Sequence, residues 1–408
     1  MIRIGDLIPA GGIEYLRERW PPLPVALLLL ACLFLVQPVI AIVALTIFCL
    51  RLEKPSLLLL LVLVVMMAVY LGLINLTRLP ESDLLVYLEW LPIAREKALS
   101  DYMAIVVEPA YSVYIYSPAN IPWSSDKLFI FLSTVIPYGI VLACIARFGC
   151  KLNLPNYAIV AVLVSVAFFP PLFNNSAHLM RQFLAGAFVA WFYIDYTMGS
   201  KNRWWLLLLA FLTHVSTVIF LPLALVGNFR KCSVCILLAI MMVFFMFDLL
   251  LLKFVSPYLT TIPYLGDVIN RAMHGVYWEH APLGIKPLLL LCLVSLFSLY
   301  KLVIGIRSGK VITRESGVNL YISSLIFCLF ILWAYLADET MLATRFTLYV
   351  YFLLAPILLL AIADAPNKKL IAGLAIATMP IYFIYTIVYG TWTYEVPGLW
   401  ISPASLMY

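Results

Sequence analysis

The chain has 408 residues, of which 65% are hydrophobic and only 11% are charged. No soluble domain could bury so much apolar surface in one core, so the composition excludes a water-soluble protein and indicates a polytopic membrane protein. The net charge of +6 comes from basic residues in short connectors. The positive-inside rule, by which Lys and Arg collect in cytoplasmic connectors, explains this net charge better than a nucleic-acid partner does.

Apolar runs of about eighteen or more residues are long enough to cross a bilayer as helices. The pattern predicts an all-α polytopic membrane protein, a single transmembrane domain over residues 1–408 with about eleven apolar helical segments. They lie near residues 23–50, 56–76, 128–146, 157–172, 178–197, 204–227, 234–252, 287–300, 318–337, 346–363 and 370–389. Two stretches between them, 77–127 and 253–286, are too long for simple connectors, and we expect them to be long extracytoplasmic loops.

Six short connectors are basic, and together they hold more than half of the Lys and Arg residues. They are Arg51/Lys54, Arg147/Lys151, Lys201/Arg203, Arg230/Lys231, the cluster Lys301, Arg307, Lys310 and Arg314, and Lys368/Lys369. The positive-inside rule places all six in the cytoplasm. The segment 204–227, which lies between two of them, would then have to enter and leave the membrane on the same side.

The segment 204–227 has a polar interruption at Thr213-His214-Val215-Ser216. Such groups can satisfy backbone freed by a helix break at membrane depth. The segment is therefore either re-entrant, with His214 at its apex, or an ordinary span that carries one buried histidine. The first apolar run poses a similar question, because a bend near Gln37-Pro38 would change the side of the N-terminus.

Arg181 stands near the start of the apolar run 178–197. A guanidinium there is costly unless it faces the protein interior and holds an anion. Arginine beside the positive end of a helix favours phosphate or diphosphate. The alternative is an arginine that snorkels to the lipid headgroups.

The residues around Arg181 extend this interpretation. We expect Asn174, Asn175 or Ser176 to cap the helix, and Ala187 and Gly186 to permit close approach of a neighbouring helix. Residues three or four apart share a helix face, which predicts one polar stripe. That stripe would consist of His178, Arg181, Gln182 and Ala185.

Other polar candidates fall on the same predicted side of the membrane. Asp83 and Glu108 are carboxylates that could act as a base, and aromatic residues accompany them, as in a sugar site or an interfacial loop. Arg345 precedes a late span and could clamp a diphosphate with Arg181, or could pair with Glu339. The loop 253–286 contributes Arg271, His274 and His280. Neither these histidines nor the eight cysteines have the spacing of a metal site.

These motifs also occur in a recognisable order. After the second hydrophobic run come Arg78, Asp83 and Tyr87, then Glu108-Pro109, Arg181-Gln182-Phe-Leu-Ala185, His214-Val-Ser216 and Arg345-Phe346. In this order and spacing they resemble the EpsG family of bacterial polysaccharide polymerases, related in role to the Wzy O-antigen polymerases. One departure is Pro80-Glu81-Ser82, where the family often carries Gly before the Asp.

The resemblance implies a multi-pass enzyme of the bacterial inner membrane, with a GT-C-like architecture and an active site that faces the periplasm. It would join undecaprenyl-diphosphate-linked oligosaccharide repeat units of O-antigen, capsule or exopolysaccharide by glycosyl transfer. The expected partners are these lipid-linked oligosaccharides, the lipid bilayer and a chain-length-regulating co-polymerase, with no nucleic acid, no metal and no other cofactor. The alternatives are an O-antigen ligase, another GT-C glycosyltransferase that uses a lipid-linked sugar, and a transporter of polysaccharide or lipid-linked glycan.

Two groups of residues would carry this reaction. The candidate catalytic residues are Glu108, Asp83 and His214, one of which would take the proton from the acceptor hydroxyl. The candidate residues for binding diphosphate or sugar are Arg181, Arg345, Gln182, His178, Arg78, Arg271 and Tyr87. The arginines would stabilise charge that develops on the leaving diphosphate.

Overall fold

The computed structural model describes residues 23–81, 83–105, 108–121, 125–198, 203–221, 224, 284–307, 318–336, 340–390, 401 and 403. Within these ranges the regular elements are helices, and no strand occurs. Among the described residues, five helices are long and apolar enough to cross a membrane, or six if one bent pair counts as a single span. The chain is therefore a multi-pass helical membrane protein, as predicted.

The helices follow the predicted apolar runs. In the first half of the chain these are α2 (Leu23–Val36), α3 (Pro38–Arg51), α4 (Leu57–Leu76), α8 (Asp126–Lys151), α9 (Asn156–Ala167), α11 (Met180–Thr197) and α12 (Trp204–Thr213). In the second half they are α16 (Ile285–Arg307), α17 (Val318–Leu336), α18 (Thr340–Asp364) and α19 (Lys368–Tyr389). The predicted segment 234–252 lies outside the described residues.

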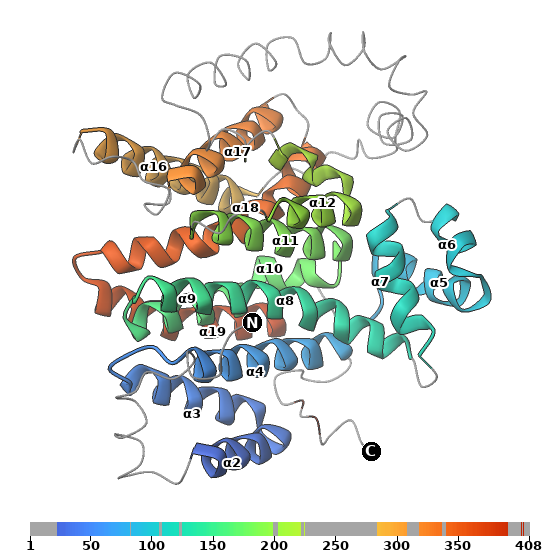
Figure 1. The fold of residues 1–408 in the computed structure, drawn as a ribbon, viewed down its shortest axis with the longest axis horizontal. Helices are drawn as coiled ribbons and strands as arrows, with labels where there is room; N and C mark the ends of the chain where they lie inside the picture. The colour runs from blue at the N-terminus through green and yellow to red at the C-terminus, as the bar shows by residue number, and fades with distance from the viewer. Residues whose placement is uncertain are drawn as a thin grey trace.

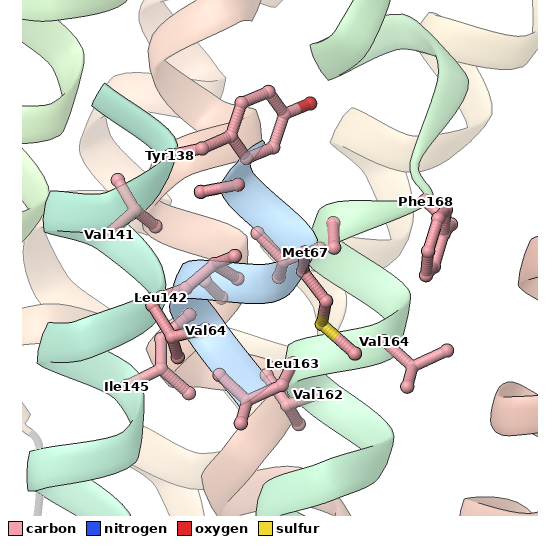
Figure 2. Close-up of a cluster of buried hydrophobic side chains, with 14 of the residues drawn as sticks. Val64, Met67, Tyr138, Val141, Leu142, Ile145, Val162, Leu163, Val164 and Phe168 are labelled. Carbon is pink, nitrogen blue, oxygen red and sulfur yellow. The ribbon is translucent and has the colours of Figure 1, made fainter. Parts of the chain in front are cut away.

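The long helices lie side by side in a stack (Figure 1). α4 packs along α8, α9 packs against α19, and α11 contacts α8, α12 and α18. Figure 2 shows the centre of the largest core cluster, where Val64 and Met67 of α4 meet Leu142 of α8 and Leu163 of α9. Because lipid is as apolar as these side chains, close packing rather than escape from water holds such helices together.

Two of the spans are interrupted near prolines. α2 ends at Val36 and α3 begins at Pro38, so the chain bends at the predicted position, where proline lacks the N–H that a continuous helix needs. α9 and α10 (Pro170–Ser176) meet at 50°. This second bend was not predicted, because 157–172 reads as one apolar run.

A third interruption lies at His214, where the re-entrant alternative placed a break. α12 ends at Thr213, His214 has an extended backbone with φ −157° and ψ 122°, and the 3-10 helix η2 (Val215–Ile219) follows. Thr213 Oγ1 donates to the Leu209 carbonyl and Thr217 Oγ1 to the His214 carbonyl, which satisfies backbone groups near the break. Whether the chain then returns to the same side stays a prediction, because Arg230 lies outside the described residues.

Several basic connectors meet at one end of the stack, which we call the basic end. Arg147 at the end of α8 and Arg203 before α12 both pair with Asp195, whose side chain is buried. Lys151 Nζ donates to the Met198 carbonyl at 2.7 Å. Arrangement of these connectors at one end agrees with the positive-inside interpretation.

Three short helices, α5 (Asp83–Glu96), α6 (Leu99–Ile105) and α7 (Pro109–Ala119), stand together at the other end of the stack (Figure 1). We call this the α5–α7 end. The stretch 77–127 was predicted as a loop, but most of it is helical, and Leu84, Tyr102 and Tyr111 pack in a hydrophobic cluster that also includes residues of α8 and α11. Four tyrosines of this stretch pack in pairs, Tyr102 with Tyr116 and Tyr111 with Tyr114. The other predicted loop, 253–286, lies outside the described residues except for its last three.

Candidate functional site

Glu108 is the N-cap residue of α7, and Pro109 occupies the first helical position. Proline suits that position because its N–H would have no helical partner. The Glu108 side chain does not cap its own helix. The Glu108 carbonyl accepts hydrogen bonds from the Ser112 N–H and hydroxyl, both at 2.8 Å. The Glu-Pro pair therefore fixes the helix start and leaves a buried carboxylate to point across to α11.

Arg181 lies in the first turn of α11 and binds that carboxylate. Its Nη1 is 2.6 Å from Glu108 Oε2, and its Nε donates to the Tyr87 hydroxyl at 3.3 Å. The Arg181 side chain is 27% exposed and that of Glu108 is 7% exposed. Arg181 is therefore held by the α5–α7 end rather than extended to lipid headgroups. In the described part of the chain, Arg181 Nη2 and Glu108 Oε1 have no hydrogen-bond partner.

α5 supplies the aromatic wall around the guanidinium. Arg181 Cζ lies 5.8 Å from the centre of the Tyr87 ring and 5.4 Å from that of Trp90, within the range of cation–π attraction. The two rings meet edge to face at 5.5 Å. Burial raises the pKa of Tyr87 above its ordinary value, and its neutral hydroxyl accepts the hydrogen bond from Arg181. Tyr87 follows Asp83, the first residue of α5, by one helical turn. The Asp-x3-Tyr spacing therefore places the two side chains on the same face of the helix.

His214 belongs to a second polar group close to the first. Its Nδ1 accepts a hydrogen bond from the Ser216 N–H at 3.2 Å. The Ser216 hydroxyl lies 2.6 Å from the Tyr349 hydroxyl, which is carried by α18. The charges of Arg181 and Arg345 both act on the His214 imidazole, so the break at His214 lies within electrostatic reach of the two arginines.

Arg345 lies in the second turn of α18, slightly inside the helix rather than at its start. His178 lies between α10 and α11. Burial lowers the pKa of His178, the charges of Arg78 and Arg345 act in the same direction, and Asp83 acts against them. These four residues from separate segments therefore share one electrostatic environment.

Arg78 and Gln182 are both buried, with 3% and 4% of their surface exposed. Arg78 Nη1 donates to the Asn174 carbonyl at 3.0 Å and so ties the end of α4 to α10. Gln182 Oε1 is buried without a hydrogen-bond partner among the described residues. Arg78 therefore holds two segments together, whereas the side-chain oxygen of Gln182 could accept a hydrogen bond from a ligand.

Two local predictions around Arg181 were wrong. Ser176 ends α10, Asn175 Nδ2 donates to Pro171 within that helix, and α11 has Leu179 at its N-cap without a side-chain cap. The prolines of α10 start a separate short helix, so the polar residues close that helix instead of opening the next. His178 accordingly precedes α11 and does not share a helix face with Arg181.

Trp90 and Tyr349 are site residues that were missed from the sequence. Trp90 is three residues after Tyr87 and Tyr349 four residues after Arg345, so helical spacing from a candidate was the available signal. Arg271, His274, His280 and Glu339 lie outside the described residues. Within the described ranges, no three His, Cys, Asp or Glu side chains come together as a metal site requires.

These observations define a class: a multi-pass helical membrane protein in which helices at one end hold a partly buried, ion-paired arginine beside further cationic groups. The family model of the EpsG family matches residues 57–396. The chain therefore belongs to the EpsG family, the family of Wzy/EpsG-type polysaccharide polymerases. Comparison with curated proteins and with solved structures gives no match.

Proposed function

We propose that this protein polymerises polysaccharide by joining undecaprenyl-diphosphate-linked repeat units. Membership of the EpsG family supports a glycosyltransferase-like polymerase. The observation that carries the proposal is the Arg181 guanidinium, which Glu108 and Tyr87 hold in place by Nη1 and Nε. Among the described residues Nη2 has no partner and could bind a ligand, and a guanidinium fixed before the substrate arrives binds an anion at a lower ordering cost.

The anion that we assign to Arg181 is the diphosphate of the lipid carrier. The planar guanidinium of arginine matches the geometry of phosphate oxygens. Arg345 adds a second positive charge to this region, because its charge acts on both His178 and His214. Negative charge develops on the diphosphate as the bond to the sugar breaks. Donors already in place at that point stabilise the transition state more than the ground state.

In the proposed reaction, the hydroxyl oxygen of an acceptor sugar bonds to the anomeric carbon of the growing chain. The bond from that carbon to the diphosphate oxygen breaks, and the lipid diphosphate leaves with the electron pair. The hydroxyl proton passes to Glu108, Asp83 or His214. Glu108 is well placed for this because only one of its two carboxylate oxygens is engaged by Arg181.

The proposed orientation places this chemistry at the periplasmic face of the inner membrane. The basic end would lie in the cytoplasm, because positively charged connectors are retained there. The α5–α7 end, with Glu108 and Arg181, is at the opposite end of the stack (Figure 1). A chain-length-regulating co-polymerase would act on the same side, where the polymer emerges.

A deletion strain tests this function. We expect glycans from the strain to collapse from a ladder to single repeat units on a gel, and expression of the wild-type chain to restore the ladder. An unchanged ladder would exclude a polymerase. Loss of linkage to the final lipid, with the ladder still present on the carrier, would instead indicate a ligase.

A further inference from the structure

His214 is held at one edge of its ring by the residue two positions later. Both the backbone N–H and the hydroxyl oxygen of Ser216 lie 3.2 Å from Nδ1. The backbone N–H can only donate a hydrogen bond, so Nδ1 must present a lone pair to it. In a neutral imidazole with Nδ1 as acceptor, the proton is on Nε2.

This arrangement gives His214 a hydrogen-bond donor at its other edge. A base needs an unprotonated nitrogen towards the acceptor hydroxyl, but Nε2 already carries a proton and Nδ1 is occupied by Ser216. A proton added to Nδ1 would place two donors against each other. The geometry therefore suits donation from Nε2 and opposes proton uptake by either nitrogen.

Tyr349 extends the same chain of hydrogen bonds. Its hydroxyl is 2.6 Å from Ser216 Oγ, and the Tyr349 side chain is fully buried on α18. One orientation makes use of every proton, with Tyr349 donating to Ser216 Oγ and the Ser216 hydroxyl donating to His214 Nδ1. Each donor polarises the next, so the chain strengthens Nε2–H as a donor.

The chain lies where an anion is expected. The charges of Arg181 and Arg345 act on His214, and the Glu108 carboxylate acts on Tyr349. Burial of the imidazole, and then the charges of the two arginines, make a further positive charge on it unfavourable. A neutral N–H beside them adds a hydrogen bond to a bound anion without that repulsion.

We propose that His214 is a neutral hydrogen-bond donor to the leaving diphosphate, and that Ser216 and Tyr349 are positioning residues that fix its tautomer. The identity of the anion rests on the proposed function. His214 keeps its Nε2 proton throughout the reaction, so the proton of the acceptor hydroxyl goes to a carboxylate, Glu108 or Asp83. This removes His214 from the candidates for the base.

Three substitutions of His214 separate a donor from a base. The amide nitrogen of glutamine reaches the place of Nε2, whereas that of asparagine reaches only the place of Nδ1. We expect His214→Gln to retain polymer formation within about tenfold of wild type, the scale of one neutral hydrogen bond. His214→Asn and His214→Ala should lose about 100-fold, the scale of a lost transition-state donor. Equal loss in His214→Gln and His214→Ala would overturn the donor role.

Solid-state NMR of the protein with ¹⁵N-labelled histidine, in lipid bilayers, reads the tautomer directly. The His214 signals are those absent from His214→Asn, and we expect them to report Nε2–H. Tyr349→Phe should shift the Nδ1 signal and lower kcat with little change in KM, whereas Tyr70→Phe, which removes the hydroxyl of a buried tyrosine on α4, should change neither. An Nδ1–H tautomer in the wild type would refute the proposal whatever reaction the protein catalyses. Absence of glycosyl transfer by the wild type would refute only the function.

Discussion

At the scale of single residues, the structure explains how a charge can be kept inside an apolar chain. Arg181 has Glu108 as its counter-ion, Tyr87 as a hydrogen-bond acceptor and the Trp90 ring beside it. A partly buried ion pair of this kind is a weak source of stability, because both charges lose hydration. Stability alone therefore does not account for the pair, and the proposed use of the guanidinium is to bind an anion.

Removal of the counter-ion tests this arrangement. In Glu108→Gln the buried charge of Arg181 loses its partner, which we expect to cost about 1–3 kcal/mol, less than for a fully buried pair because Arg181 is partly exposed. Polymer formation should fall by about 10–100-fold as the guanidinium loses its fixed position. Thermal unfolding in detergent and glycan gels measure the two effects. Glu89→Gln, on the exposed face of α5, is the control and should match wild type; a Glu108→Gln protein that also matched it would contradict the account.

The sequence was informative about individual charges and less so about their neighbours. Arg181 could be selected because charge at membrane depth is rare, and Glu108 because it is a carboxylate that could act as a base and because the Glu108-Pro109 pair belongs to the motif order of the family. Their contact, and the hydrogen bond of Tyr349 to Ser216, join segments far apart in the chain, and one sequence carries no signal for such a pair. The cap at Asn174–Ser176 was wrong because a separate helix uses those residues.

At the scale of elements, the spacing of α11 and α18 determines how far Arg181 lies from Arg345. Gly186 of α11 faces the ring of Phe352 of α18, and a Cβ at Gly186 would overlap that ring. The prediction that Gly186 permits close helix approach is confirmed. Apolar runs predicted the long helices well, but the bend between α9 and α10 and the helical nature of α5–α7 depend on tertiary packing that periodicity does not show.

Gly186→Ala therefore should separate α11 from α18. We expect it to destabilise the protein by about 1–3 kcal/mol through overpacking and to lower polymer formation as the two arginines move apart. Gly139→Ala on α8 is the matched control, because its new Cβ would meet nothing within 4 Å. Addition of Phe352→Leu to Gly186→Ala should restore part of the activity. Equal melting temperatures and activities for the two alanine variants would show that the close contact is unimportant.

At the scale of the whole molecule, hydrogen bonds and ion pairs sort the connectors into two sets. Asp195 joins Arg147 to Arg203, Asn156 Nδ2 donates to the Leu52 carbonyl at 2.5 Å, and these contacts gather basic connectors at one end. Arg78 and Arg181 make their contacts at the other end. The gathering of basic connectors at one end, which was predicted from charge alone, is thus visible in the fold. The side of the membrane that the chain reaches after η2 is a matter for labelling experiments.

Cysteine labelling from each side of the membrane follows that path. In a variant without native cysteines, single cysteines at positions 201 and 230 should both react with a cytoplasmic reagent and neither with a periplasmic one, because a re-entrant 204–227 returns to its starting side. A cysteine at position 54, in another basic connector, provides the cytoplasmic control. Labelling of 201 and 230 from opposite sides would show that the segment crosses the membrane.

The most direct measurement uses purified protein in lipid vesicles with a lipid-diphosphate-linked repeat unit as the only substrate. The wild type should form a glycan ladder and release one lipid diphosphate for each bond made. Arg181→Lys keeps the charge but loses the planar fork, and should reduce both products by about 100-fold. Arg95→Lys, at an exposed ion pair with Asp126 at 3.1 Å, should leave both unchanged. An Arg181→Lys protein that makes polymer of wild-type length at the wild-type rate would contradict the assignment of Arg181 to the diphosphate.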